Sequence, residues 1–466
     1  MKVILLNPPY PRNFIRSARC TVLPISGSNW YPIFLAYAAG WLEKHGHEVK
    51  LIDALVANIS TDKLRIIATS FRPKMLVVYV SDKSLRNDLT VAKKIKRANN
   101  CQLVAVGPRC SFQPEKILEK YPDVDSVVRR EFDDVLLDLA NNKDKKKIPG
   151  LIWRSGKRII SNPERSFLTE KQLDEFPFVT DVYRRHLPIN KYYQASLLHP
   201  FVDLFTARGC AWNKCTFCLW PNTIHKNAAY RPRSIESVIA ELKFIKSKLP
   251  EVKEVFFQDD MIPALRAKQL SLAILKAKLQ MNWSCYTKAD IDSETLKLMK
   301  KSGCRFLHVG YESSNQTILN NIRKGTTPQT AKKFTQDSLR AGLRIHGDFI
   351  LGLPGETETT INKTISWAKK LGIEGYQFFV PEPNKETPLF EQLSKKHCLT
   401  KQNSINYPRL SNNRLNYYRF RAMKEIYLDP GYIFRTVRGI KSTGDFFRLL
   451  RTAYHVIPSI IFPPKA

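Results

Sequence analysis

The sequence lacks any apolar run that could cross a membrane, and it lacks the dense cysteine pattern of a small secreted domain. No stretch approaches the roughly 18–20 apolar residues of a membrane-spanning helix. The segment Met1–Arg12 indicates a strand entering a proline turn, without the apolar core and cleavage site of a signal peptide. Of nine cysteines, an odd number, only Cys210, Cys215 and Cys218 lie close together. We therefore expect a protein of the reducing cytoplasm.

Acidic residues are also scarce, with 42 Asp and Glu against 75 Lys and Arg and a net charge of +33. A surplus of this size favours an anionic partner: nucleic acid, an anionic membrane surface or a phosphorylated substrate. The segment Arg409–Arg451 mixes Arg and Lys with Tyr, Phe, Leu and Ile. It can lie on an anionic bilayer, bind nucleic acid, or pack an apolar helix face on the rest of the protein.

The 466 residues are too many for one compact core, so two or three domains are expected. Over the first ~145 residues, strand-like runs alternate with helical patterns, which predicts a doubly wound parallel sheet that binds ligands at the carboxyl ends of its strands. Ser81 and Gly107 each follow a strand and are the candidate contacts, although either fits an ordinary turn equally well. The strand-like runs are Val3–Leu6, Val49–Ile52, Leu76–Val80, Leu103–Val106 and Val127–Val128.

A second series of six strand and helix units begins near Phe201 and predicts a partial barrel of the (β/α)6 type, with its site at the carboxyl ends of the strands. We expect an α/β protein with a first domain at 1–145, a bridge at 146–199, the barrel at 200–398 and a basic helical extension at 399–466. The six strand-like runs are Val202–Phe205, Val255–Phe257, Trp283–Tyr286, Phe306–Val309, Ile345–Leu351 and Tyr376–Val380.

The first strand of the second series leads into the loop that carries Cys210, Cys215 and Cys218. Thiolates are the ligands of iron–sulfur clusters, and three of them can hold three irons of a cubane while the fourth stays open to a small molecule. A structural zinc site is the main alternative. It requires four protein ligands, and the nearest histidine, His225, lies seven residues beyond Cys218. The spacing therefore favours a cluster.

With Phe217 directly before its last cysteine, this loop resembles the signature of the radical S-adenosylmethionine family, although four residues instead of three separate Cys210 and Cys215. The resemblance extends from about residue 200 to 395. It implies a 4Fe–4S cluster on the three cysteines and S-adenosylmethionine on the open iron. It also implies contacts to S-adenosylmethionine from Phe217, from Asp259 and Asp260 near the amino group, from Glu312 and Ser313 near the ribose and carboxylate, and from Gly352 beside the adenine.

The chain resembles most the cobalamin-binding members of that family, and among them those associated with hopanoid lipid biosynthesis. The segments that carry this likeness are Cys215-Thr-Phe-Cys218-Leu-Trp-Pro221, Tyr230-Arg-Pro-Arg-Ser234, Glu131-Phe-Asp133 and Ile345-His-Gly347. The resemblance implies that the first domain binds cobalamin. An Asp-x-His-x-x-Gly motif, which supplies the axial histidine in many cobalamin proteins, is absent, so we expect cobalamin without a histidine ligand. His45 and His47 end a predicted helix and are expected on the surface.

The predicted function is cobalamin-dependent radical chemistry on an unactivated carbon, in particular methyl transfer to a lipid or isoprenoid-type metabolite. By resemblance, an external reductant such as a flavodoxin or ferredoxin reduces the cluster, a 5′-deoxyadenosyl radical abstracts hydrogen, and methylcobalamin supplies the methyl group. The sequence does not indicate which residues act on the substrate. We expect a cytoplasmic protein with peripheral contact to the inner face of the membrane.

Three other functions remain open: ring contraction with the same cofactors, methylthiolation of RNA, and a non-catalytic cluster or cobalamin sensor. RNA methylthiolation requires a second cluster on three amino-terminal cysteines. Cys20, Cys101 and Cys110 are not expected at strand ends, where such a cluster would be held, so we expect no nucleic-acid partner.

Overall fold

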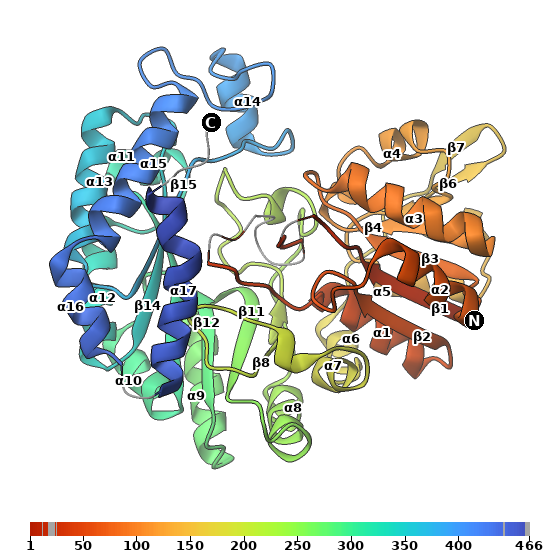
Figure 1. Ribbon diagram of the computed structural model, residues 1–466, viewed down its shortest axis with the longest axis horizontal. Coiled ribbons are helices and arrows are strands. Elements are labelled where there is room, and N and C mark those ends of the chain that lie inside the picture. The colour runs from red at the N-terminus through yellow and green to blue at the C-terminus, as the bar shows by residue number, and fades with distance from the viewer. Residues whose placement is uncertain (12, 17–23, 25, 441–442, 462–466) are drawn as a thin grey trace.

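Two α/β units lie side by side in the computed structural model, which describes residues 1–11, 13–16, 24, 26–440 and 443–461. The first unit is at the right of Figure 1 and the second, with the carboxyl-terminal helices against it, at the left. This is the predicted α/β architecture of a doubly wound sheet followed by a partial barrel.

The first sheet has the strand order β2-β1-β3-β4-β5-β6-β7, and its first five strands are parallel. Its strands are almost continuously apolar because helices cover both faces, with α1 and α5 on one side and α2, α3 and α4 on the other. Strands β1 and β3 are parallel, but the strands that follow are added on opposite sides of this pair, β2 beside β1 and β4 beside β3, which opens a crevice at their carboxyl ends. The elements are β1 Lys2–Asn7, α1 Ile33–Lys44, β2 Glu48–Asp53, α2 Thr61–Phe71, β3 Met75–Tyr79, α3 Leu85–Asn99, β4 Gln102–Val106, α4 Pro114–Lys120, β5 Ser126–Val128 and α5 Asp133–Ala140.

The first sheet continues beyond residue 145, into the segment expected to be an irregular bridge. Strands β6 (Leu151–Ser155) and β7 (Arg158–Ser161) form an antiparallel hairpin that extends it. Gly156 takes a positive φ of 58° in the tight turn between them. A short hairpin carries no crossover helix, so the alternation of strands and helices that marks the rest of the domain is absent here. Helices α6 (Glu170–Asp174) and α7 (Val179–His186) then lead to the barrel.

The second sheet is the predicted six-stranded partial barrel, with the order β15-β14-β13-β12-β11-β8 and every pair parallel. Serine, threonine or aspartate side chains cap α8, α10, α12 and α13, which fixes where these helices begin after the strand connections. The elements are β8 Phe201–Leu204, α8 Ile235–Lys248, β11 Glu254–Ile262, α9 Ala264–Lys276, β12 Asn282–Thr287, α10 Ser293–Lys301, β13 Cys304–Glu312, α11 Gln316–Asn321, α12 Pro328–Arg340, β14 Arg344–Ile350, α13 Glu358–Lys370 and β15 Gly375–Phe379.

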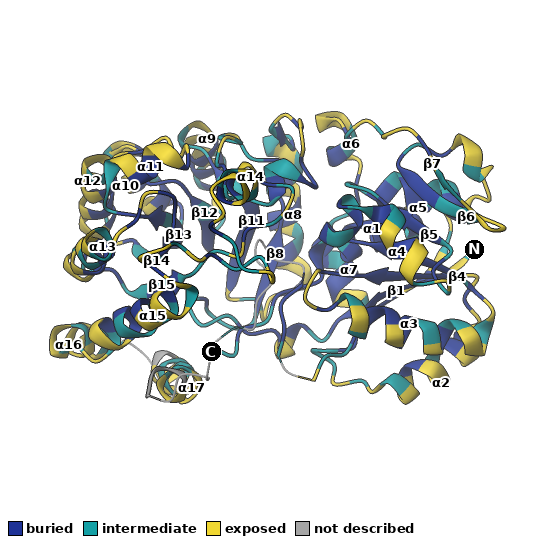
Figure 2. Ribbon diagram, turned by 90° about the horizontal axis from the view of Figure 1, so that it is seen from above, coloured by how far each residue is buried: buried dark blue, intermediate teal, exposed yellow. Residues whose placement is uncertain are grey.

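Helix α14 (Pro388–Lys395) follows the last barrel strand, and the carboxyl-terminal extension after it is helical, as predicted, with α15 (Asn412–Tyr427), α16 (Pro430–Arg438) and α17 (Thr443–Ile461). Helix α15 packs on β15, where the Tyr427 hydroxyl donates to the Tyr376 carbonyl at 2.8 Å. Figure 2 shows α15, α16 and α17 together on one side of the barrel, with α9, α10 and α11 on the other. None of the helices in the described part of the chain is both long and apolar enough to cross a membrane.

Candidate active site

A cavity of about 1920 Å³ lies between the two units and extends into the barrel. The first domain lines it with residues that follow β3 and β4, including Asp82, Pro108 and Arg109. The barrel contributes the cysteine loop and the inward-facing residues of its strands, and α17 contributes Arg448 and Thr452. The strand ends of both sheets and the predicted cluster loop therefore open into one space.

The cysteine loop leaves β8 at a point that Asp259 holds in place. The buried Asp259 carboxylate accepts hydrogen bonds from the backbone N–H of Thr206 at 2.6 Å and from that of Ala207 at 3.2 Å. Burial raises the pKa of Asp259 to about 6 despite these donors. Asp259 does not line the cavity, and its position indicates that it shapes the start of the loop.

All three cysteines of the loop line the cavity and are half-buried. The Trp212 indole donates to the Arg323 carbonyl at 2.8 Å, which fixes the loop against the segment after α11. A Cβ on Gly325, which has a φ of +67°, would lie 1.9 Å from the Trp212 ring, so only glycine fits there. No three His, Cys, Asp or Glu side chains in the described ranges gather closely enough to hold a single metal ion. A cubane takes one thiolate on each iron and does not need such a group.

Two buried acceptors beside the loop fit the polar end of S-adenosylmethionine. Asp260 lines the cavity, and its Oδ2 atom has no hydrogen-bond partner among the described residues. Asn213 also lines the cavity, and its Oδ1 atom likewise has no hydrogen-bond partner among the described residues. His225 Nε2 lies 3.6 Å from Asp260 Oδ2, but burial lowers the pKa of His225, which favours the neutral imidazole. A buried acceptor without a partner is costly, so each of these two oxygens suits an ammonium group as its hydrogen-bond donor.

Glu312 also faces the cavity, at the carboxyl end of β13. Its carboxylate pairs with Lys324 Nζ at 2.6 Å, and its backbone has a φ of +63°. A Cβ on Gly310 would come 2.4 Å from the Glu312 carboxylate, so glycine leaves room for this side chain. The positive φ is rare for glutamate and is typical of residues at functional sites.

The predicted cofactor contacts divide into two groups. Phe217, Asp260 and Glu312 line the cavity, whereas the other five lie behind its wall. The Ser313 hydroxyl is within hydrogen-bonding distance of Thr364 Oγ1, at 3.3 Å, and Gly352 packs against Leu415. The five residues behind the wall are Ser81, Gly107, Asp259, Ser313 and Gly352.

In the first domain, Ser81 and Gly107 directly precede residues that line the cavity. The buried Ser81 hydroxyl lies 2.8 Å from that of Ser84, inside the domain. Gly107 has a φ of +111°, and a Cβ there would lie 2.6 Å from the Val80 carbonyl oxygen. Glycine therefore permits the close approach of the two strand ends, and the residues after it reach the cavity.

No histidine of the first domain reaches the cavity in the described part of the chain. His45 is exposed, with Nδ1 2.8 Å from the Trp41 carbonyl, and His47 Nδ1 lies 3.0 Å from the amino terminus. His45 agrees with the surface placement expected from the sequence, whereas His47 is half-buried, with a buried Nε2 atom.

The expectation that the amino-terminal cysteines avoid strand ends is wrong for Cys110. It lies in the turn Pro108–Ser111, directly after β4, although it is fully buried and does not line the cavity. Burial raises its pKa well above the usual range of a thiol, which disfavours the thiolate that a cluster requires. Cys101 precedes β4, and Cys20 lies outside the described residues.

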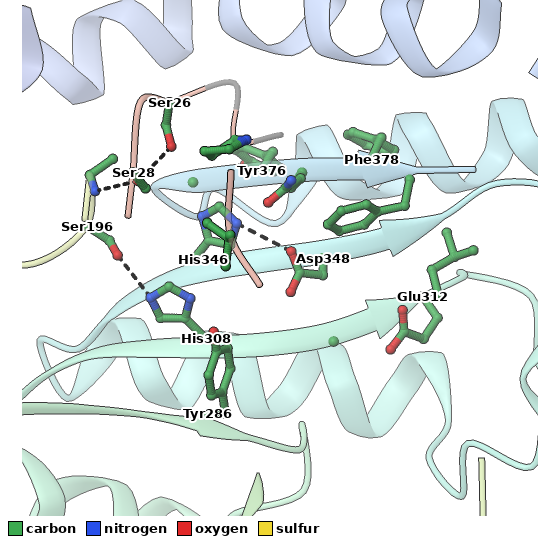
Figure 3. A pocket seen from close by; sticks show the side chains of 18 of the residues that line it. Ser26, Ser28, Ser196, Tyr286, His308, Glu312, His346, Asp348, Tyr376 and Phe378 are labelled. Atoms are coloured by element: carbon green, nitrogen blue, oxygen red, sulfur yellow. Dashed lines mark hydrogen bonds and ion pairs between the residues drawn. The ribbon is translucent and has the colours of Figure 1, made fainter. Parts of the chain in front are cut away.

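A polar group inside the barrel, around His308 and His346, was not predicted from the sequence (Figure 3). Ser196 Oγ donates to Gln194 Oε1 at 2.5 Å, so the 2.9 Å contact between Ser196 and His308 uses the Nε2–H of His308 as donor. Burial, the neighbouring His346 and Arg305 lower the pKa of His308 far below its usual range, and it stays neutral. The two imidazole rings stack with centroids 5.2 Å apart, and His346 Nε2 lies 3.4 Å from Asp348.

A sequence signal for this group was present. Alternate residues of a strand face the same side, and His308, Gly310 and Glu312 of β13 all line the cavity even though the pairing with β14 shifts register between Gly310 and Glu312. Figure 3 shows His308 and Glu312 on this strand, with Glu312 toward its carboxyl end. Once Glu312 is placed at the site, the same parity predicts that His308 faces the cavity.

Two family models match the chain: the B12 binding domain over residues 21–140 and the radical SAM superfamily over residues 204–368. The uncharacterized methyltransferase PH0819 of Pyrococcus horikoshii is 30% identical over 416 residues, which cover 87% of this chain and 86% of that protein.

Two solved structures share the fold. The radical S-adenosylmethionine methyltransferase TsrM from Kitasatospora setae, with tryptophan and an S-adenosylmethionine analogue bound, is 17% identical with a TM-score of 0.66, over 85% of this chain and 76% of that one. The cobalamin-dependent S-adenosylmethionine radical enzyme OxsB, with aqua-cobalamin and S-adenosylmethionine bound, is 14% identical with a TM-score of 0.69, over 99% of this chain and 72% of that one. This chain belongs to the cobalamin-binding radical S-adenosylmethionine enzymes, whose cofactors are a 4Fe–4S cluster, S-adenosylmethionine and cobalamin.

Proposed function

We propose that the enzyme transfers a methyl group to an unactivated carbon of a lipid or isoprenoid-type metabolite. The observation that carries this proposal is the single cavity that joins the cysteine loop, the strand ends of the first domain and the barrel interior. When bound, the cofactors supply a 5′-deoxyadenosyl radical and a methyl group. A substrate inside the barrel would be within reach of both, because all three parts open into the same space.

The residues of the chain would hold these groups in separate places. Cys210, Cys215 and Cys218 would ligate the cluster, while Asp260 and Glu312 would bind the polar groups of S-adenosylmethionine. Cobalamin would lie over the strand ends of the first domain. Side chains with a large apolar surface line the barrel interior and support a hydrocarbon-rich substrate: Phe306, Ile345, Ile373, Tyr376, Phe378 and Phe379.

Neutral His308 offers its Nδ1 lone pair as an acceptor, because its Nε2–H is already donated to Ser196. A hydroxyl group on the substrate could donate to this nitrogen and fix one end of an otherwise apolar molecule. The likeness to hopanoid-associated members is compatible with this substrate class and stays a prediction.

Isotope transfer tests the proposal. The reconstituted, reduced enzyme is incubated with trideuteromethyl-labelled S-adenosylmethionine and a lipid extract. We expect 5′-deoxyadenosine together with a lipid product that has gained a labelled methyl group, both measured by mass spectrometry. Formation of 5′-deoxyadenosine and an unlabelled, rearranged product would instead assign ring contraction. A protein that binds its cofactors without cleaving S-adenosylmethionine would be a sensor.

Cobalamin coordination gives a separate prediction. We expect about one cobalamin per chain, bound in the base-off form, because the histidines of the first domain lie at the far end of α1. The measurement is electron paramagnetic resonance of the Co(II) form, which should show no hyperfine splitting from an axial histidine nitrogen. A histidine signal that disappears in the His308→Ala or His346→Ala variant would contradict the expectation and place the ligand in the barrel.

The proposal also includes two partners. An external one-electron reductant, such as a flavodoxin or ferredoxin, would reduce the cluster, and the net charge of +33 supports docking of an acidic protein. The same charge supports peripheral contact of a cytoplasmic enzyme with an anionic membrane.

A further inference from the structure

Helices α16 and α17 present large apolar side chains to solvent. We call these side chains the outer apolar face. Helix α15 packs on the barrel, but the two helices after it leave these positions uncovered (Figure 2). The members are Ile433, Phe434 and Val437 of α16 and Phe446, Phe447, Leu450, Tyr454 and Ile457 of α17, each between 45% and 77% exposed.

The opposite side of α17 faces the protein. Arg448, Leu449, Thr452 and Val456 line the cavity, at the spacing of one helix face. The Tyr193 hydroxyl donates to the Arg448 carbonyl at 3.3 Å, which attaches this side of the helix to the segment before β8. An ordinary surface helix turns its apolar stripe toward the core. In α17 the inward side mixes Arg448 and Thr452 with Leu449 and Val456, while the aromatic residues face outward.

Positive charge accompanies the outer apolar face. The sequence 430–461 contains five Arg and Lys residues and one acidic residue, Asp445. Arg435 and Arg438 are exposed on α16, next to Phe434 and Val437, whereas the guanidinium of Arg451 lies over the Tyr193 ring at 3.7 Å, toward the inner side of α17. Exposed apolar groups bordered by basic groups match the two layers of an anionic bilayer surface, its acyl boundary and its charged headgroups.

We propose that the outer apolar face of α16 and α17 inserts into the surface of an anionic lipid bilayer. The inference rests on the proposed function, in which the substrate is a lipid-type metabolite, because membrane contact would bring such a substrate close to the cavity. Because the inner side of α17 lines that cavity, contact of its outer side with a bilayer brings lipid within one helix diameter of the barrel interior. The helix then separates the bilayer from the site.

Two other occupants fit the surface less well. Single-stranded RNA binds through bases stacked on aromatic rings, but four of the eight exposed residues are aliphatic and offer no ring. A second copy of the chain would bring an equal positive charge against the basic residues around the face, and like charges oppose that contact. An anionic bilayer satisfies the apolar and the basic residues together.

Flotation of the full chain, reconstituted with its cofactors, tests the inference. The vesicles are phosphatidylglycerol and phosphatidylcholine in equal parts, compared with phosphatidylcholine alone. We expect the wild-type protein to float with the anionic vesicles, and the bound fraction to fall as salt is raised. The double variant Phe434→Ser with Phe447→Ser should reduce the partition coefficient by about tenfold or more, because both rings lose their place among the acyl chains. Arg438→Gln should reduce it about fivefold.

The matched control replaces two equally exposed apolar residues elsewhere. Ile66 on α2 and Leu265 on α9 are 71% and 69% exposed, so Ile66→Ser with Leu265→Ser removes apolar surface without touching the outer apolar face. This control should float like the wild type. All variants should keep the wild-type circular dichroism spectrum, cobalamin content and 5′-deoxyadenosine formation, since none of the replaced residues lines the cavity.

Four results would overturn the inference. The wild-type protein could float with neither kind of vesicle, or the control variant could lose vesicle binding as much as the test variant. Alternatively, the protein could bind mixed RNA but no vesicles, or form a dimer that Phe447→Ser dissociates while no vesicle binding is seen. Each leaves the proposed function intact if labelled methyl transfer to a lipid is seen. Conversely, vesicle binding without a methylated lipid product would contradict the proposed lipid substrate and would still support membrane binding by the outer apolar face.

Discussion

Replacing Cys218 with alanine should abolish both the cluster and the formation of 5′-deoxyadenosine. The residue is one of three thiolates that line the cavity on a single loop, and a cubane with two protein thiolates is not retained. Without the cluster, S-adenosylmethionine cleavage returns to its uncatalysed rate, a loss of at least about a million-fold. Iron and sulfide analysis and chromatography of the product give the two readouts.

Cys101→Ala is the control for this variant. Cys101 is also a free cysteine, but it lies buried in the first domain, before β4. Its replacement leaves a small cavity that costs about 1 kcal/mol of unfolding free energy and should leave four irons per chain in place. Full cluster content in Cys218→Ala, or loss of the cluster in both variants, would contradict the assignment of the loop.

The strands and the cysteine loop could be predicted because their signals are local. An apolar run of four to six residues bounded by turns marks a buried strand, and the strands β3 and β4 were located in this way. The spacing of Cys215 and Cys218 likewise lies within four residues. Such patterns depend only on the backbone geometry of one element.

The direction of individual side chains could not be predicted in the same way. Asp259 and Asp260 were both assigned to S-adenosylmethionine, yet of these two consecutive residues of β11 only Asp260 lines the cavity. The pairing of β11 with β12 shifts register between Phe257 and Ile262, so the parity of the strand is interrupted beside the pair. Only the structure separates the carboxylate that holds the loop from the one that faces the cavity.

The orientation of the carboxyl-terminal helices was also beyond the sequence. Amphipathy shows that a helix has two faces, and three interpretations of residues 409–451 were open. Helix α15 follows the ordinary interpretation, with Leu415 and Tyr418 buried on the barrel. Helix α17 departs from it, because Arg448 and Thr452 line the cavity beside Leu449 and Val456, while its aromatic residues are exposed. Which face turns inward depends on the polarity of the surface beneath the helix, and that surface is built from distant parts of the chain.

Two short segments that carried the family resemblance meet at the boundary of the two units. Glu131 and Asp133 belong to the first domain, and they pair with Arg231 and Arg208 beside the cysteine loop. About a hundred residues separate Glu131 from Arg231, so no local pattern connects them. The conformation of the cysteine loop is therefore tied to the position of the first domain.

Replacing Arg208 with alanine should destabilise the protein by about 3–5 kcal/mol, because it leaves a buried carboxylate without its counter-charge. Arg208 Nη1 lies 2.8 Å from Asp133 Oδ2 and Nη2 lies 3.3 Å from Oδ1, and both side chains are 4% exposed. Urea denaturation of the wild type and the variant measures the difference. The matched control is Arg65→Ala, which removes a surface partner of Asp62 and should change stability little.

The pH dependence of stability reports on the neighbouring Glu131. Burial alone would raise its pKa, but Arg208 and Arg231 together lower it from 4.5 to about 2. The folded state therefore holds this carboxylate ionised at a pH where the unfolded chain is already protonated. The contribution of Glu131 to stability is complete above pH 4.5 and is lost as the pH falls toward 2. In Glu131→Gln this component should be absent, and the unfolding free energy should fall less steeply over that interval.

A double variant separates the charge of this interface from its packing. If the loss in Arg208→Ala arises from the unpaired Asp133 carboxylate, then Arg208→Met combined with Asp133→Leu should recover most of the stability, because apolar groups of similar volume replace a buried ion pair with little cost. The same variant also loses the contact between Arg208 and Glu131, at 3.6 Å, and with it part of the link between the first domain and the cysteine loop. We therefore expect recovered stability and normal cluster content, together with slower methyl transfer. A double variant as unstable as Arg208→Ala would show instead that the shape of the arginine holds the two units together.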